Sequence, residues 1–228
     1  MSRWPIWPSV KKSFLSKWYR FFHYQNDYCQ QKKWVQSFLE SKKKNFSNSW
    51  GLVDAYNLGL GDYRIVKKAL QDITLNKTSL ELGCLDGKWT QTYPWAANEV
   101  ILVDVDKSIE STLKNKFGKE IRFYETSGNE LYGIADESVD FVFSMDILVR
   151  CRRNIIFSYF REFSRVLKKD GEIYIHLSCD SIEGSVKRMS TPLSLREIDN
   201  LSTKNSFVDL RIDTKTLEHG VMVKAKKQ

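Results

Sequence analysis

The sequence of 228 residues predicts an α/β protein with a seven-stranded, mostly parallel sheet whose last strand runs antiparallel, preceded by a helical N-terminal extension. Three observations support this fold class. Short apolar strands alternate with helical stretches from residue 78 onward, which is typical of βαβ units with both sheet faces covered. A glycine-containing turn, "LELGCLDG", follows the first of these strands. The chain ends with a helix and then two strands joined by a short turn.

Residues 1–50 differ in composition from the rest of the chain. The first fifty residues hold ten Lys or Arg and two acidic residues, whereas residues 51–228 hold 26 basic and 26 acidic residues. The whole net charge of +8 therefore lies in residues 1–50. Five of the seven tryptophans also lie in this segment. Apolar residues recur at helical spacing over 13–39, and the polar stretch 41–49 is typical of a linker. We therefore expect a basic, aromatic helical extension at 1–50 and an α/β domain at 51–228.

The elements of the domain follow from apolar periodicity. A helix over 62–73 leads into the domain. The expected strands lie at 79–83, 99–105, 121–126, 139–145 and 171–178. The helices between them are expected at 88–97, 107–117 and 153–168. A helix over 193–202 then precedes a hairpin of strands at 207–216 and 219–226, which closes the sheet.

The bulk composition excludes several classes of protein. With 42% hydrophobic and 13% aromatic residues, the chain is expected to be globular rather than disordered. Its apolar runs are far shorter than the roughly 18 residues of a membrane-spanning helix, and its first residues lack the apolar stretch of a signal peptide, so we expect a cytoplasmic protein. The four cysteines are widely spaced without a CxxC pair, which indicates reduced thiols rather than a zinc site or a disulfide framework.

The turn after the first expected strand has the features of a ligand-binding bend. Glu81 ends the strand with a carboxylate, and Gly83 and Gly87 allow close approach of the backbone and positive φ angles. Asp104 stands at the end of the next strand, 17 residues beyond Gly87. A carboxylate in that position can accept both hydroxyls of a ribose. In such sheets the ligand binds at the carboxyl ends of the strands, so these residues predict a nucleotide-like ligand.

Several longer segments resemble the class I S-adenosylmethionine-dependent methyltransferases of the small-molecule type. These segments are "LELGCLDGKWT", "VILVDVD", "SVDFVFSMDILVR" and "FSYFREFSRVLKKDGEIYIHLS", and the resemblance covers roughly residues 75–226. It implies a Rossmann-like sheet, methyl transfer as the activity and S-adenosylmethionine as the cofactor. It says nothing about the methyl acceptor.

The resemblance also implies which residues bind the cofactor. It assigns the methionine-side loop to Glu81, Gly83, Cys84, Leu85 and Gly87, the ribose hydroxyls to Asp104, and the adenine to Val105. It assigns the adenine amine to Ser127, Gly128 or Asn129, where the family's usual aspartate is absent, and the methyl-bearing side to Ser144, Met145 and Asp146. Leu85 departs from the family pattern because it stands where a glycine is usual. A side chain turned into the pocket would block it, and one turned away would leave it open.

The sequence offers little evidence for a catalytic base. No His–Asp pair and no metal-ligand cluster stands out, so no metal is expected, and Asp146 is the candidate catalytic residue. Two interpretations of Asp146 remain, pocket lining and capping of the segment that follows it. His176, inside an apolar strand, and His219, in the final hairpin turn, are expected to have packing or structural roles.

The partners are expected to be set by the extension. Its lysines favour an anionic acceptor, which we expect to be a small molecule or a lipid-linked or sugar-linked group. Three interpretations of residues 1–50 compete: a lid over the acceptor pocket, a basic amphipathic helix on an anionic membrane surface, or contact with single-stranded nucleic acid, the least favoured. A different hypothesis is a degenerate domain that binds partners and no cofactor. Leu85 and the missing adenine-loop aspartate support that alternative.

Overall fold

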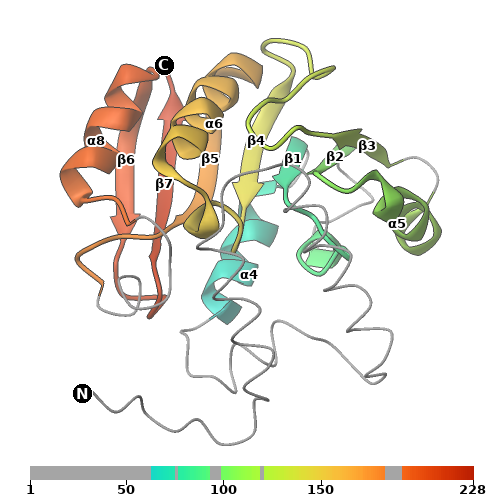
Figure 1. Ribbon diagram of the computed structural model, residues 1–228, viewed down its shortest axis with the longest axis horizontal. Helices are drawn as coiled ribbons and strands as arrows, with labels where there is room; N and C mark the ends of the chain where they lie inside the picture. The colour runs from blue at the N-terminus through green and yellow to red at the C-terminus, as the bar shows by residue number, and fades with distance from the viewer. Residues whose placement is uncertain (1–62, 75–76, 93–98, 119–120, 183–191) are drawn as a thin grey trace, which may run out of the picture.

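The computed structural model describes residues 63–74, 77–92, 99–118, 121–182 and 192–228 (Figure 1). The expected extension at 1–50 lies outside these residues. The strands are β1 (Thr78–Leu82), β2 (Glu99–Asp104), β3 (Arg122–Glu125), β4 (Val139–Ser144), β5 (Leu167–Leu177), β6 (Phe207–Asp213) and β7 (Val221–Lys227). The helices are α4 (Tyr63–Thr74), α5 (Glu110–Phe117), α6 (Arg153–Val166) and α8 (Leu195–Lys204), with short 3-10 turns η1 (Thr90–Thr92), η3 (Lys107–Ile109) and η4 (Leu148–Arg150).

The strands form one seven-stranded sheet in the order β3-β2-β1-β4-β5-β7-β6. The first five pair in parallel, whereas β7 is antiparallel to both β5 and β6. This confirms the expected mostly parallel sheet with an antiparallel last strand. The strand order reverses between β1 and β4, and in open α/β sheets the carboxyl ends beside such a reversal form the ligand crevice. The fold therefore brings the loops after β1, β2 and β4 together at one end of the sheet, where ligands of such sheets bind.

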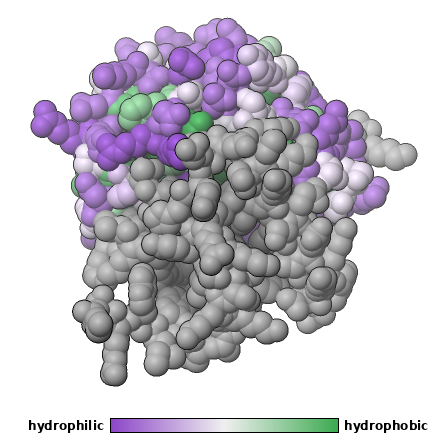
Figure 2. All heavy atoms as spheres, viewed as in Figure 1, coloured by the Kyte–Doolittle hydropathy of each residue, from purple (hydrophilic) through white to green (hydrophobic). Residues whose placement is uncertain are grey.

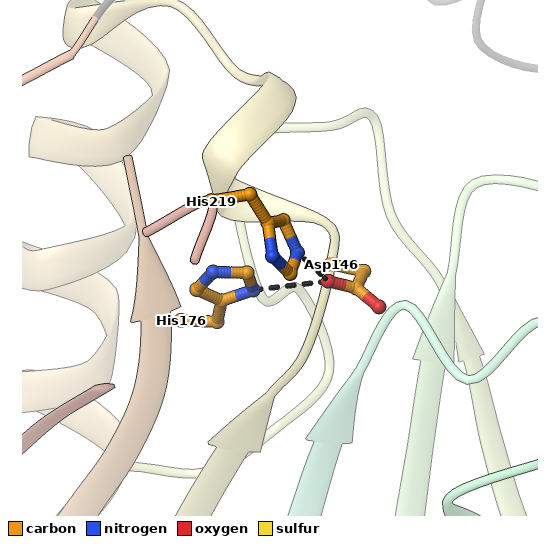
Figure 3. A group of neighbouring side chains, drawn as sticks. All are labelled: Asp146, His176 and His219. Atoms are coloured by element: carbon orange, nitrogen blue, oxygen red, sulfur yellow. Dashed lines mark hydrogen bonds and ion pairs between the residues drawn. The ribbon is translucent and has the colours of Figure 1, made fainter. Parts of the chain in front are cut away.

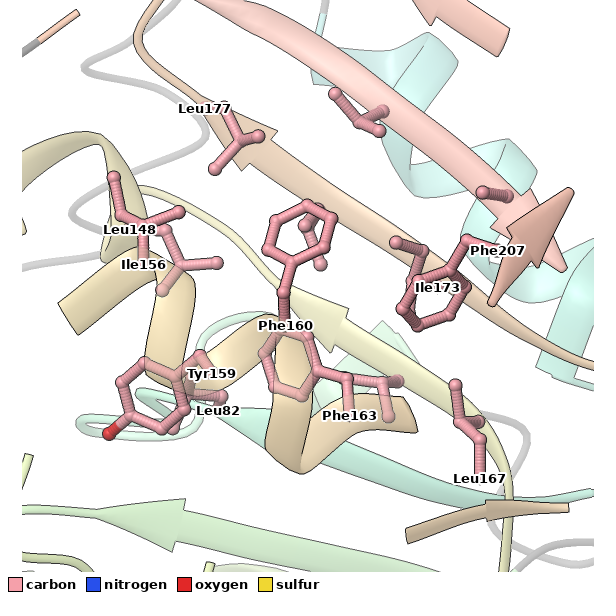
Figure 4. Packing of buried hydrophobic residues seen from close by; sticks show 14 of the residues in the cluster. Leu82, Leu148, Ile156, Tyr159, Phe160, Phe163, Leu167, Ile173, Leu177 and Phe207 are labelled. Atoms are coloured by element: carbon pink, nitrogen blue, oxygen red, sulfur yellow. The ribbon is translucent and has the colours of Figure 1, made fainter. Parts of the chain in front are cut away.

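Two apolar layers cover the sheet. On one face α6 and α8 pack on alternate strand residues, and Figure 4 shows this α6–α8 cluster with Phe160 and Phe163 at its centre. On the other face α4, α5 and Trp89 pack on the remaining strand residues, including Phe141 and Phe143, and we call this layer the α4–α5 cluster. Each fully buried side chain of this size contributes about 1.5–3 kcal/mol relative to an exposed one. Side chains alternate between the two faces along each strand, and this alternation decides which residues belong to each cluster.

Two expected elements differ from the structure. Over 88–92 the expected helix is replaced by a turn and η1. Here the Thr92 hydroxyl donates to the Trp89 carbonyl at 2.7 Å, and the Thr90 hydroxyl donates to the Glu81 carboxyl on β1 at 2.7 Å. Such side-chain bonds compete with helix formation. β5 begins at Leu167, four residues before the strand expected at 171–178, and it bends at Asp170, whose φ is 63°. A Cβ on Gly171 would lie 2.8 Å from the Lys168 carbonyl oxygen, so the bend requires glycine.

The described surface is mostly hydrophilic on the face shown in Figure 2. Among the described residues the exposed large hydrophobic side chains are scattered over several elements: Ile65, Tyr132, Phe157, Leu195 and Val208. Scattered apolar side chains are normal for a folded protein in water. None of the helices in the described part of the chain has the length and apolarity that crossing a bilayer requires.

Candidate active site

The bend after β1 has the backbone path of a glycine-rich turn, although its middle residue is leucine. Gly83, Leu85 and Gly87 have φ angles of 79°, 47° and 76°. The Gly83 N–H donates to the Val103 carbonyl at 2.7 Å, which ties the bend to the end of β2. A non-glycine residue in this left-handed region costs about 1–2 kcal/mol. Leu85 therefore takes the conformation that the sequence resemblance assigns to glycine, at an energetic cost.

The Leu85 side chain is half-buried and packs against the α4–α5 cluster. The two flanking glycines are needed for contacts within the protein. A Cβ on Gly83 would collide with Ile147 in the loop after β4, and a Cβ on Gly87 would collide with Phe117 at the end of α5. The bend is thus packed directly against the loop that follows β4.

Asp104 joins this bend to the next strands. One carboxylate oxygen accepts the Leu85 N–H at 3.0 Å and the other accepts the Asp106 N–H at 3.2 Å. The Asp104 carbonyl accepts the Thr126 N–H at 2.9 Å, so the loop after β3 is attached to the same residue. The residue is only 3% exposed, and burial raises the pKa of its carboxyl to about 6, although the backbone bonds oppose this rise. The expected acid and bend are therefore in direct contact.

Glu81 lies on the same sheet face, close to Asp104, and is 2% exposed. The Thr90 hydroxyl donates to its carboxyl at 2.7 Å. Burial raises the pKa of Glu81 to about 8, and the charges of Asp104 and Asp86 act in the same direction. The Glu81 carboxyl is consequently mostly protonated at neutral pH, which avoids two adjacent buried carboxylates in this crevice.

The loop after β3 carries the three residues expected near an adenine amine. The Gly128 N–H donates to the Thr126 hydroxyl at 3.1 Å, and the Ser127 hydroxyl donates to the Asn129 side-chain oxygen at 2.9 Å. Ser127 is exposed, Asn129 is half-buried, and Val105 packs against the edge of the α4–α5 cluster. The structure brings this loop beside Asp104 through Thr126. Contact of these residues with an adenine stays a prediction.

The side chains of Cys84, Ser144 and Met145 are turned into the protein. The Ser144 hydroxyl donates to the Leu82 carbonyl at 3.1 Å between β4 and β1. Cys84 and Met145 belong to the α4–α5 cluster, and burial raises the pKa of the Cys84 thiol well above its usual value. Cys84 therefore packs as a small apolar residue. Contacts between these residues and a cofactor stay a prediction.

Asp146 follows β4 and is in contact with both described histidines (Figure 3). One of its carboxylate oxygens lies 3.0 Å from Nδ1 of His176, near the end of β5, and 3.1 Å from Nε2 of His219, just before β7. The two imidazole rings meet edge to face with their centroids 4.6 Å apart. Both rings are buried, whereas the Asp146 side chain is 28% exposed and its other oxygen points away from both rings (Figure 3).

The protonation states in this group follow from burial and pairing. Although burial alone would disfavour the charged form, the hydrogen bonds from His176 and His219 hold the pKa of Asp146 well below its usual range. Burial lowers the pKa of His176 to about 4, against the opposing effect of Asp146. Because the ionised carboxylate can only accept, each ring nitrogen facing it carries a hydrogen. An acid held this firmly in its ionised form is a weak base, which disfavours proton abstraction by Asp146.

This group overturns two expectations from the sequence. The expected absence of a His–Asp pair and of a metal-ligand cluster is wrong, because Asp146, His176 and His219 present three potential ligand atoms within 4.8 Å of one another. Asp146 also does not cap the segment after it, since η4 has Ile147 at its N-cap and no side-chain cap bond. The signal that was missed is topological. The end of β5 and the start of the antiparallel β7 are neighbours at the same end of the sheet, where Leu177 pairs with Val221.

Comparison with known proteins agrees with this geometry. A family model described as "Methyltransferase domain" matches residues 80–175. The Saccharomyces cerevisiae protein "Probable S-adenosylmethionine-dependent methyltransferase CRG1" is 31% identical over 100 residues, which are 42% of this chain and 33% of that protein. The aligned part thus spans about a third of the length of that curated relative.

Two solved structures of SAM-dependent methyltransferases have the same fold. The protein from Archaeoglobus fulgidus superposes with a TM-score of 0.59 at 13% identity, covering 78% of this chain and 100% of its own. The protein from Aquifex aeolicus superposes with a TM-score of 0.56 at 15% identity, covering 79% and 100%. At these identities the likeness concerns the fold alone. It confirms the expected Rossmann-like sheet.

Proposed function

We propose that this chain is a class I S-adenosylmethionine-dependent methyltransferase, on the support of the methyltransferase-domain match over residues 80–175 and the similarity to the yeast relative, and that it transfers the methyl group of S-adenosylmethionine to a small-molecule, lipid-linked or sugar-linked acceptor. The observation that carries the proposal is the 3.0 Å hydrogen bond from the Leu85 N–H to the buried Asp104 carboxylate. It joins the strand-end acid and the bend at one crevice, despite the leucine in the middle of the bend.

The donor and acceptor groups of the crevice fit an adenosyl ligand. A carboxylate has about four lone-pair directions on its two oxygens. Asp104 uses one direction on each oxygen for the backbone N–H groups of Leu85 and Asp106. The backbone N–H of Val105 also interacts with this carboxylate. In this proposal the remaining acceptor capacity of the two oxygens is used by the neighbouring hydroxyls of a ribose. Because Glu81 is protonated, Asp104 is the one of these two carboxyl groups that carries the negative charge.

The contribution of the protein to methyl transfer is mainly positioning. The cofactor supplies an activated methyl group on a sulfonium, and rate is gained when the acceptor atom is held in line with that methyl. In this proposal Asp104 and the bend at 83–87 fix the adenosyl end, and the acceptor lies at the carboxyl ends of β4 and β5. Asp146, whose second carboxylate oxygen points away from both histidines, borders that position.

Isothermal titration calorimetry with S-adenosylmethionine tests the proposal. The wild-type chain should bind with a dissociation constant in the micromolar range. Asp104→Asn should weaken binding about 10- to 100-fold, because hydrogen bonds to a charged group contribute about 1.5–3 kcal/mol. Asp170→Asn is the matched control, since Asp170 is an exposed aspartate at the bend in β5. Absence of heat with the wild-type chain at high ligand concentration would favour a non-catalytic scaffold.

A further inference from the structure

We propose that Asp146, His176 and His219 form a binding site for a divalent transition-metal cation at the acceptor end of the sheet. The three residues come from distant parts of the sequence, and each offers one ligand atom. They converge because β5 ends where the antiparallel β7 begins, beside the loop that follows β4. This site is separate from the adenosyl crevice formed by Asp104 and the bend at 83–87.

The spacing of the ligand atoms suits one cation. A metal about 2.1 Å from each ligand sets neighbouring ligand atoms about 3.0 Å apart in octahedral geometry and about 3.4 Å apart in tetrahedral geometry. The Asp146 oxygen lies 3.0 Å from the His176 nitrogen and 3.1 Å from the His219 nitrogen. All three ligand atoms lie within 4.8 Å of one another. A cation could bind between them once each imidazole carries its hydrogen on the other ring nitrogen and the two facing nitrogens approach to about 3.0–3.4 Å.

The chemistry of the group points to the class of metal. Two imidazoles with one carboxylate are the ligands of catalytic zinc and of non-haem iron(II) sites, which keep at least one position open. Metal ligands bind as neutral imidazole and ionised carboxylate, and each of the three side chains presents one such ligand atom to the others. The chemistry thus selects a zinc-class or iron-class cation over Ca²⁺ or Mg²⁺, which prefer oxygen ligands.

The arrangement is costly for a purely structural cluster. Nε2 of His176 is buried without a hydrogen-bond partner among the described residues, and an unsatisfied buried polar atom costs about 1–3 kcal/mol. Asp146 is held at φ 61°, and the Arg150 side chain donates to its carbonyl at 2.6 Å. A Cβ on Gly220 would collide with the His176 ring, so the ring also needs a glycine beside it. Strain and unmet polar groups of this kind concentrate at functional sites.

A cation at this site would extend the proposed methyltransferase function, on which this consequence rests. Three protein ligands leave a position for an oxygen or nitrogen of the acceptor. A hydroxyl bound there would have a lowered pKa, because a bound cation stabilises the oxyanion. Asp146 would then act as a ligand instead of a base.

Titration of the chelator-treated, tag-free protein with Co²⁺ tests the site, because visible d–d absorption reports binding to nitrogen and oxygen ligands. His176→Asn and His219→Gln keep an N–H near the Asp146 oxygen but remove the imidazole ligand. Each should weaken Co²⁺ binding by about 100-fold or more, since outer-sphere changes alone cost about 10- to 100-fold. His23→Gln is the matched control, as His23 is the remaining histidine of the chain. Zn²⁺ retained after dialysis should be lost in the same two variants.

The result that overturns this inference is a wild-type protein that gives no Co²⁺ absorption and retains no Zn²⁺. Equal Co²⁺ affinity in wild type and His219→Gln would also overturn it, because the ligands would then be elsewhere. Calorimetry with S-adenosylmethionine on the same preparation separates the two proposals. Cofactor binding without cobalt binding would refute the metal site alone, and cobalt binding without cofactor binding would refute the methyltransferase proposal alone.

Discussion

Replacing Glu81 with glutamine should change how the stability of the protein depends on pH. The pKa of the Glu81 carboxyl is raised from 4.5 to about 8 in the folded state. Folded and unfolded states both bind this proton below pH 4.5. Between pH 4.5 and 8 the unfolded state releases it more readily, so stability is lost as pH rises through this window. Glutamine has no such proton and avoids the loss.

The size of the effect follows from the shift. Each pKa unit corresponds to about 1.4 kcal/mol. Between pH 5 and pH 8 the unfolding free energy of Glu81→Gln should therefore rise relative to wild type by about 3–4 kcal/mol. Urea unfolding at constant ionic strength measures this difference, with Glu218→Gln, at an exposed glutamate, as the control for the substitution itself. A difference that stays constant over this range would refute the assignment of a protonated, buried Glu81.

Three further predictions follow from particular residues. Leu85 has φ 47°, a conformation that glycine adopts without strain. In urea unfolding, Leu85→Gly should therefore be about 1 kcal/mol more stable than Leu85→Ala. A more stable Leu85→Ala would contradict the left-handed bend. NMR titration of His176 should show that the ring stays neutral down to a pH near 4. The stability that the neutral ring contributes above pH 6.5 is therefore lost as pH falls through about 4. A titration near pH 6.5 would refute the burial of His176 beside Asp146. Ser194→Ala removes the capping box of α8 and should lower the melting temperature, at a cost of about 1 kcal/mol, whereas Ser206→Ala, at an exposed serine, should not.

Local sequence patterns predicted most of the sheet. The apolar strands, the turn at 83–87 and the closing hairpin each depend on neighbouring residues, and all are present in the structure. The helix expected over 88–97 is absent over 88–92 because of side-chain hydrogen bonds, one local and one to β1. Thr90 is bound to Glu81 and Thr92 to the Trp89 carbonyl, and these bonds are invisible to apolar periodicity.

The Asp146 group could not be predicted in the same way. His176 lies in an apolar strand and His219 in a hairpin turn, and each alone resembles a structural histidine. Their meeting depends on the register of β5 with β7 and on the loop after β4, which are long-range properties. The orientation of Leu85 was equally open in the sequence, because the same residue could have pointed into the crevice. Only its φ angle and its packing on the α4–α5 cluster distinguish the two cases.

The central claim is that the Asp104 carboxylate and the bend at 83–87 bind the adenosyl end of S-adenosylmethionine. A crystal structure of the chain soaked with S-adenosylhomocysteine tests this claim most directly. We predict that both ribose hydroxyls lie within hydrogen-bond distance of the Asp104 oxygens, with the Leu85 side chain still packed on α4 and α5. Density for the nucleoside away from Asp104, or Leu85 occupying the ribose position, would contradict the account.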